Sequence, residues 1–102
     1  MKLSYIIIPH ETKLGSTEKL LRKTLDEFYI EFGGCTHYPV TGICKGHTLG
    51  LPCEKIEVAV QPDEHDVFIM MAKDVADEAG VKEIMVQDYE GDIHFIPGKG
   101  AN

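Results

Sequence analysis

The amino-acid sequence predicts an α+β fold, in which two helices cover one face of an antiparallel sheet. Three stretches have the length and the β-branched content of strands: residues 3–8, 56–60 and 81–89. Between them, residues 16–31 and 63–79 repeat apolar side chains at helical spacing, and each stretch is followed closely by glycine. A chain of 102 residues is long enough for one core. We therefore expect a single domain over residues 1–96.

The first strand holds three consecutive isoleucines and ends at Pro9, which cannot donate a hydrogen bond to a ladder. Consecutive isoleucines make this strand apolar on both faces. The helices would cover only one face of the sheet, so the other face is expected to pack against further copies of the chain. Residues 10–15 are expected to form a loop.

The first helix has a predicted start and a predicted end. Ser16 or Thr17 can cap its first turn, and the helix is expected to run to about Glu31. The glycines at 33 and 34 then end it in the left-handed conformation. Its apolar side recurs at i, i+4, i+7 and i+11: Leu21, Leu25, Phe28 and Phe32.

Residues 35–44 mix polar and apolar side chains around Pro39 and Gly42. That mixture is typical of an irregular or edge strand with a bulge. Residues 45–52 are expected to be the connecting loop before the chain re-enters the sheet near Ile56, where apolar and polar residues alternate.

The second helix is expected to be capped by Asp63 and to end at Gly80. Its apolar stripe is predicted from five residues: Val67, Met70, Met71, Val75 and Ala79. The last main strand is followed by a turn and a short extra strand at 93–96. Residues 97–102, with two glycines, are expected to form a flexible tail.

The resulting order is β-α-β-β-α-β with one added C-terminal strand. That order is the ferredoxin-like plan, an antiparallel sheet with both helices on one face. In this plan, a large binding site is expected to be shared with a neighbouring subunit, because a domain this small encloses no deep cleft of its own.

Composition excludes some partners. Seventeen acidic residues against ten basic ones give a net charge of −7, whereas nucleic-acid binding depends on neutralising phosphates with basic side chains. No nucleic-acid partner is therefore expected. No apolar run is long enough to span a bilayer, and the N-terminus lacks a signal-peptide pattern. We expect a cytoplasmic protein that does not bind membranes.

One carboxylate, Glu54, lies at the entry to the apolar strand, opposite residues 39–44 if the two segments pair as a hairpin. Partial burial there would destabilise its ionised form unless a ligand cation or a neighbouring donor compensates, which makes it a candidate for chemistry. The alternative is a solvated strand-end glutamate beside Lys55. His10, directly after the first strand, is a second candidate, able to contact a ligand. Its alternative is an exposed loop histidine.

Cysteines and histidines gather in the middle of the chain. Five possible zinc ligands lie close in sequence: Cys35, His37, Cys44, His47 and Cys53. Their spacing matches no closed zinc knuckle, and strand alternation would send some of them to opposite faces. We expect reduced thiols and no metal. Cys44 with His37 or His47 is the pairing that a nucleophilic thiol could use, although no third residue is placed to orient the base.

The central stretch resembles a known family. The run F-G-G-C-T-H-Y-P-V-T-G at 32–42, the Cys-Lys pair at 44–45 and the run E-K-I-E-V at 54–58 are similar to the phage-encoded S-adenosylmethionine lyases, formerly described as hydrolases. Cys44 stands where that family has a tyrosine after Thr-Gly, and Tyr38 is the aromatic residue expected to replace it.

The resemblance implies a trimer of ferredoxin-like subunits with active sites between them and no cofactor. It implies cleavage of S-adenosylmethionine, or of a nucleotide conjugate of it, to 5′-methylthioadenosine or its conjugate and homoserine lactone. Glu54 matches the family's essential glutamate. Substrate-binding residues are expected around it: Thr41, Gly42, Tyr38, His10 and Cys44. A phage origin, an anti-defence role and the host cytoplasm are further implications.

A second function is compatible with the same pattern. Small trimeric ferredoxin-like proteins resembling the nitrogen-regulatory signal proteins bind adenine nucleotides between subunits without turning them over. A non-enzymatic binding module of that kind is one alternative to a lyase, and a stress-type or structural oligomer with no ligand is a third possibility.

Overall fold

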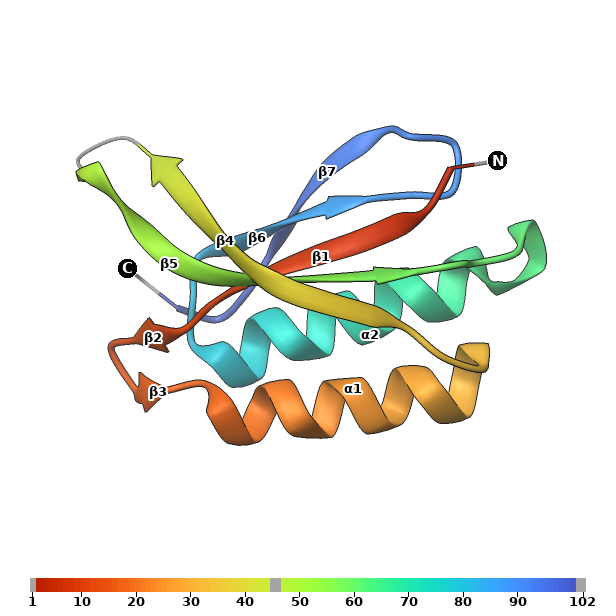
Figure 1. The fold of residues 1–102 in the computed structure, drawn as a ribbon, viewed down its shortest axis with the longest axis horizontal. Helices are drawn as coiled ribbons and strands as arrows, with labels where there is room; N and C mark the ends of the chain where they lie inside the picture. The colour runs from red at the N-terminus through yellow and green to blue at the C-terminus, as the bar shows by residue number, and fades with distance from the viewer. Residues whose placement is uncertain (1, 45–46, 101–102) are drawn as a thin grey trace.

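The computed structural model describes residues 2–44 and 47–100, without the side chains of residues 43, 44 and 47–49. Five strands form the main sheet: β1 (Ser4–Pro9), β4 (Thr36–Cys44), β5 (His47–Val58), β6 (Glu83–Gln87) and β7 (Ile93–Pro97). Their order is β4-β5-β1-β6-β7, and every neighbouring pair is antiparallel. Helices α1 (Glu18–Phe32) and α2 (His65–Ala79) lie on the same face of this sheet (Figure 1). The predicted α+β class is confirmed, and the observed order is compatible with the ferredoxin-like plan.

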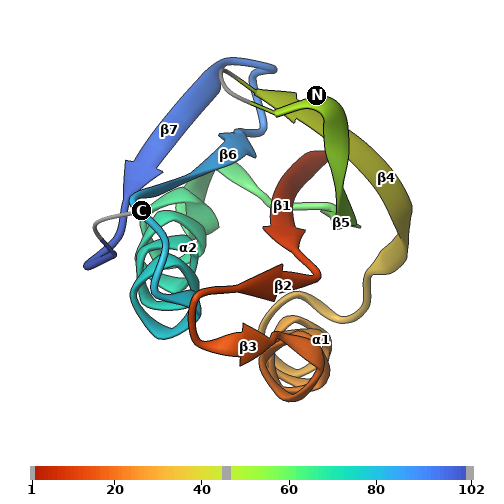
Figure 2. The same cartoon turned by 90° about the vertical axis from the view of Figure 1, so that its left-hand side faces the viewer.

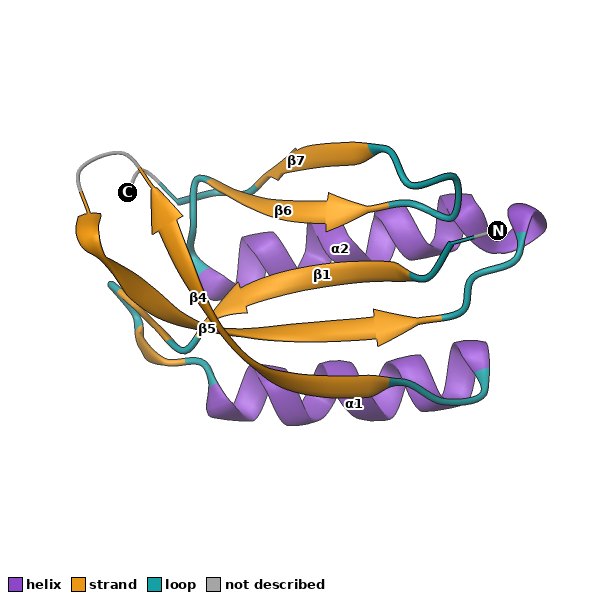
Figure 3. Ribbon diagram, turned by 45° about the horizontal axis from the view of Figure 1, so that its top comes forward, coloured by secondary structure: helices purple, strands orange, loops and turns teal. Residues whose placement is uncertain are grey.

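The core lies between the two helices and the sheet (Figure 3). Phe28 of α1 and Phe68 of α2 are fully buried, and their ring centroids are 6.0 Å apart. On the sheet side, Ile6 and Ile8 of β1 are fully buried, whereas Ile7 between them is only half-buried. β1 therefore points one set of side chains into the core and the other toward the face that no helix covers.

The start of α1 differs in detail from the predicted cap. Thr17 occupies the capping position, but its hydroxyl donates to the carbonyl oxygen of Pro9. The Oγ of Ser16 instead accepts the backbone N–H of Glu18 at 3.2 Å. At the other end, Gly33 has a φ of 87°, a conformation that costs glycine little, so the predicted left-handed end is confirmed.

Two predicted loops contain strands. Within residues 10–15, β2 (Glu11–Thr12) begins a short hairpin that is completed by β3 (Gly15–Ser16). Figure 2 shows this hairpin between the end of β1 and the start of α1. The second loop, predicted at 45–52, is wrong over 47–52, because β5 begins at His47; residues 45 and 46 lie outside the described residues.

Pro52 explains how β5 extends so far. The carbonyl oxygen of Pro52 accepts the N–H of His10 at 2.9 Å, so this backbone unit faces β1. In an antiparallel ladder the N–H and C=O of one residue point to the same side. The missing N–H of Pro52 therefore falls on the side where β1 has already ended, and the ladder with β4 continues. β4 lies at one edge of the sheet, with a register shift between Gly42 and Cys44, as predicted.

The predicted stripe of α2 is partly wrong. Met70 is 63% exposed and Val67 is 37% exposed. The buried residues of this helix are Phe68, Ala72, Val75, Ala76 and Ala79. Both stripes have helical spacing, and the one that carries the large aromatic ring faces the core because its burial removes more apolar area from water. The predicted end at Gly80 is confirmed by its φ of 69°.

The last strands follow the prediction with shorter bounds. β6 is confined to Glu83–Gln87, and the added strand β7 pairs with it. Beyond β7, the backbone N–H groups of Gly98 and Gly100 donate to the carbonyl oxygens of Lys82 and Val81, at 2.7 and 2.9 Å. This part of the predicted tail is therefore hydrogen-bonded to the segment before β6. Within residues 2–44 and 47–100, neither helix has the length and apolar character needed to cross a membrane.

Candidate functional site

The register of three strands brings Glu54 together with two histidines. Glu54 on β5 lies opposite Ile8 of β1 on one side and opposite Pro39 of β4 on the other. His10 comes two residues after Ile8, and His37 two residues before Pro39. Because side chains two apart along a strand share a face, all three lie on the face that the helices cover. We call this set the His-Glu-His trio.

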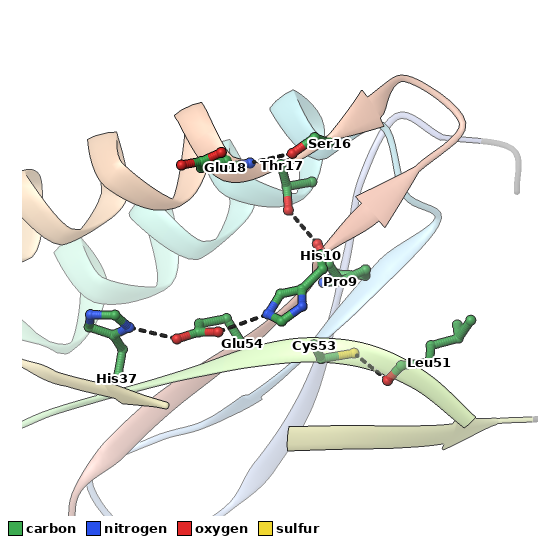
Figure 4. Close-up of polar contacts among 9 residues, drawn as sticks. All are labelled: Pro9, His10, Ser16, Thr17, Glu18, His37, Leu51, Cys53 and Glu54. Carbon is green, nitrogen blue, oxygen red and sulfur yellow. Dashed lines mark hydrogen bonds and ion pairs between the residues drawn. The ribbon is translucent and has the colours of Figure 1, made fainter. Parts of the chain in front are cut away.

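The contacts within the trio are direct. The Oε1 atom of Glu54 lies 2.8 Å from Nε2 of His10, and its Oε2 atom lies 2.6 Å from Nδ1 of His37 (Figure 4). The carboxylate is buried, whereas the two histidine side chains are 41% and 46% exposed. Each oxygen of the carboxylate thus has its own partner, and the charge lies behind two imidazole rings that solvent reaches.

The histidines decide the ionisation of Glu54. Burial by itself raises the pKa of this carboxyl, but the hydrogen bonds from His37 and His10 outweigh burial, so the pKa lies below its ordinary value. Glu54 is therefore ionised at neutral pH. The expectation of a partly buried carboxylate with neighbouring donors is borne out by this geometry, and the alternative of a solvated glutamate is not.

The backbone of His10 is fixed on two sides. Its N–H donates to Pro52 of β5, and its carbonyl oxygen accepts the N–H of Thr17 at 3.0 Å. The Thr17 hydroxyl also binds the carbonyl oxygen of Pro9. The start of α1 therefore anchors the segment that carries the imidazole of His10, which places a rigid donor beside Glu54 even though the residue follows the end of a strand.

Two open cavities adjoin the trio. The larger has a volume of about 330 Å³ and is lined by His10, Pro39, Val40, Thr41, Gly50 and Pro52. The smaller, about 200 Å³, is lined by His10, Ser16, Thr17, Glu18 and Leu21. His10 is the residue that the two cavities share, and Glu54 lines neither. A molecule in either cavity would therefore lie against His10 and not against Glu54.

The other predicted site residues do not belong to the His-Glu-His trio, and the structure places them in different surroundings. Thr41 lines the larger cavity. Gly42 lies next to Cys53, whose sulfur would be 3.2 Å from a Cβ atom at position 42. Tyr38 lies on the uncovered face, since the Nζ atom of Lys55 is 5.9 Å from its ring centroid there. Within one chain, Tyr38 is therefore not brought to Glu54. The side chain of Cys44 lies outside the described residues.

His37 is the site residue that the sequence did not predict as part of this arrangement. The sequence indicates it as a possible zinc ligand, as a base for a thiol or as a contact for the added phosphate of a nucleotide conjugate, but not as a partner of Glu54. No group of three or more potential ligands able to hold a metal ion is found among the described residues. The available signal was the pairing of residues 36–44 with the strand of Glu54, because His37 then falls on the same face, one diagonal step away.

A second buried carboxylate makes a useful comparison. Asp88, beyond the other end of β1, lies 2.7 Å from Nε2 of His94 through Oδ2, and its Oδ1 accepts the N–H groups of Glu90 and Asp92. Burial raises the pKa of this carboxyl, but the hydrogen bonds from His94 and the two N–H groups outweigh burial and lower it. Neither of the two cavities is lined by Asp88. Its contacts close the turn between β6 and β7.

No protein-family model matches this chain, and a search of curated proteins finds no match. The resemblance of the central stretch to the S-adenosylmethionine lyases therefore stays a prediction.

Proposed function

We propose that this protein is a lyase that cleaves S-adenosylmethionine, or a nucleotide conjugate of it, to 5′-methylthioadenosine or its conjugate and homoserine lactone. The observation that carries the proposal is the buried, ionised Glu54, which is hydrogen-bonded to a histidine that lines a cavity of about 330 Å³. A fixed negative charge behind two imidazoles suits a ligand whose reacting end is cationic.

The proposed reaction needs no atom from the protein. The carboxylate oxygen of the substrate bonds to its own γ-carbon, the carbon–sulfur bond breaks, and the electron pair of that bond goes to sulfur. The sulfonium becomes a neutral thioether, and the amino-acid part closes to the lactone. The protein has to hold the chain of the substrate in this folded geometry and keep water out, which is the contribution of orientation in an intramolecular reaction. Glu54, behind His10, would stabilise the positive charge of the substrate electrostatically during that step.

The size of the cavity bears on the subunit count. Pockets for small molecules usually enclose about 300–1,000 Å³, so the larger cavity is near the lower limit. We propose that a neighbouring subunit completes it, in a trimer of ferredoxin-like subunits. The strand order and the uncovered sheet face support this assembly. Phe95 and Ile93 on β7 are 57% and 45% exposed, and they pair with residues of β6 that point away from the core. Apolar side chains on this face would be buried by a neighbouring subunit.

The enzymatic proposal is tested by incubating the purified protein with S-adenosylmethionine and measuring 5′-methylthioadenosine and homoserine lactone by mass spectrometry. Glu54→Gln should abolish both products and leave the protein folded. Asp88→Asn is the matched control, because it also neutralises a buried carboxylate bonded to a histidine, at a place that lines neither cavity. Loss of turnover in both variants would mean that activity follows stability, and the proposed role of Glu54 would be wrong.

One observation favours the binding-module alternative. Both oxygens of Glu54 already accept hydrogen bonds from the protein, so the carboxylate is satisfied without a ligand. In a trimeric adenine-nucleotide-binding module, wild-type protein would bind a nucleotide without consuming it, and Glu54→Gln would change only the dissociation constant. Calorimetry with ATP and with S-adenosylmethionine separates this outcome from turnover.

A further inference from the structure

The tautomers of the two histidines follow from the charge of Glu54. An ionised carboxylate has no proton to donate, so each imidazole nitrogen that touches it must carry the hydrogen. His37 therefore carries its proton on Nδ1, and His10 carries its proton on Nε2. In a neutral imidazole the other nitrogen is an acceptor. With both imidazoles in their neutral form, the trio has a net charge of −1 and an acceptor nitrogen, Nδ1, on His10.

The three members have different access to a ligand. His10 lines both cavities, whereas neither His37 nor Glu54 lines either of them. Glu54 receives a bond on each oxygen from opposite sides, so losing the bond to His37 would free the carboxylate to rotate away from His10. His37 thus acts on a ligand only through the other two residues.

The charges around the cavities favour a positive ligand. Among their described lining residues there is no lysine or arginine, and the one charged side chain is Glu18, which is paired with Arg22 at 3.0 Å. An anion would meet no free cation there and would be repelled by Glu54. A primary ammonium group combines positive charge with hydrogen-bond donors on one compact centre, which suits the single acceptor nitrogen of His10 better than the planar fork of a guanidinium.

We infer that His10 is the residue of the trio that contacts the ligand, that His37 is a positioning residue, and that the site selects a ligand with a primary ammonium group. This inference deepens the proposed function, because it rests on a ligand occupying the same site. The Nδ1 atom of His10 accepts a hydrogen bond from the ammonium group, Glu54 supplies the opposite charge, and His37 holds Glu54 in place. This ammonium selectivity applies whether or not the ligand is cleaved.

Ligand selectivity can be measured with two probes that differ in one group. 5′-(3-Aminopropylthio)-5′-deoxyadenosine carries an ammonium group, and 5′-propylthio-5′-deoxyadenosine does not; neither contains a sulfonium, so neither undergoes the lyase reaction. The wild-type protein should bind the first about tenfold or more tightly, the size of one charge-assisted hydrogen bond. His10→Gln keeps a donor for Glu54 but loses the ring acceptor, and it should reduce this preference. Equal binding of the probes, or binding of neither, would overturn the inference.

The positioning role has its own pair of variants. His37→Leu removes the donor to Glu54, and His37→Asn keeps an N–H close to the position of Nδ1. The first should lose the ammonium preference, and the second should restore most of it. In the ligand-free protein, long-range proton–nitrogen NMR should find the His10 proton on Nε2, and His37→Leu should turn this signal into a tautomer mixture. A His10 proton on Nδ1, or an unchanged preference in His37→Leu, would refute the assignment.

These results are separable from the lyase test. Cleavage of S-adenosylmethionine without an ammonium preference would support the proposed lyase activity and refute the inference about ligand selectivity. An ammonium preference without cleavage would support the selectivity and refute the lyase activity, in favour of a binding protein.

Discussion

Replacing Glu54 by glutamine should have a small, calculable effect on stability and a large one on function. The carboxylate accepts two bonds, at 2.8 and 2.6 Å. Glutamine keeps one oxygen, so one histidine retains its acceptor, while the other must change tautomer to accept from the new amide. Because glutamine is neutral, both charge-assisted bonds, worth about 1.5–3 kcal/mol each, become neutral bonds worth about 0.5–1.5 kcal/mol each. Because both histidines are nearly half exposed, solvent reduces the loss.

The expected cost is therefore about 1 kcal/mol, which lowers the melting temperature of a domain of this size by about 4–8 °C. Thermal unfolding followed by circular dichroism at pH 7 measures this shift, and the mass-spectrometric assay measures turnover on the same samples at a temperature where both proteins are folded. A melting temperature unchanged within about 1 °C would refute the hydrogen-bonded trio as a contributor to stability. Retained turnover would refute the role of Glu54 in the proposed reaction.

Three further predictions concern stability. In urea unfolding, Phe68→Ala should lower the free energy of unfolding by about 3–5 kcal/mol, because the ring is fully buried. Met70→Ala, at an exposed position of the same helix, should lower it by less than about 0.5 kcal/mol, and similar losses in the two variants would contradict the assignment of the Phe68 side of α2 to the core. Gly33→Ala should cost about 1 kcal/mol, since the φ of 87° is strained for alanine even though a Cβ would meet no atom within 4 Å; a more stable variant would contradict the left-handed end of α1. Finally, the lowered pKa values of Glu54 and Asp88 give stability that is complete above the ordinary carboxyl pKa, about 4, and is lost as pH falls through the lower folded values. The double variant Glu54→Gln, Asp88→Asn should lose less free energy of unfolding than the wild type between about pH 4 and pH 2. If the free energy of unfolding falls equally with pH in the two proteins, other carboxylates control acid unfolding.

Strong local signals account for the parts of the fold that the sequence predicted well. The ends of the helices were predicted from Gly33 and Gly80, because a residue with positive φ stops a helix whatever lies around it. The buried face of α2 was not predicted, because two stripes have the same helical spacing and the predicted stripe left out Phe68, whose ring lies in the core. The sequence predicts a loop over residues 45–52 because Gly46 and Gly50 usually interrupt a strand.

Glu54 and His10 could be singled out from the sequence by their places at the two ends of strands. That they touch, and that His37 joins them, depends on which residues of β1, β4 and β5 lie opposite one another. A shift of one residue in either pairing would move a histidine to the other face of the sheet. Local composition does not contain that register, because it is set by packing of the buried side chains of all three strands.

The sequence by itself determined an acidic α+β chain with two helices, the glycines at which they end, and a carboxylate at a strand entry. These features depend on the preferences of single residues and on periodicity along the chain. Only the tertiary structure decided that this carboxylate is ionised, that it is held by two histidines from neighbouring strands, and that one of those histidines lines two cavities. The reason is physical: ionisation depends on burial and on partners, and the partners lie 17 and 44 residues away along the chain.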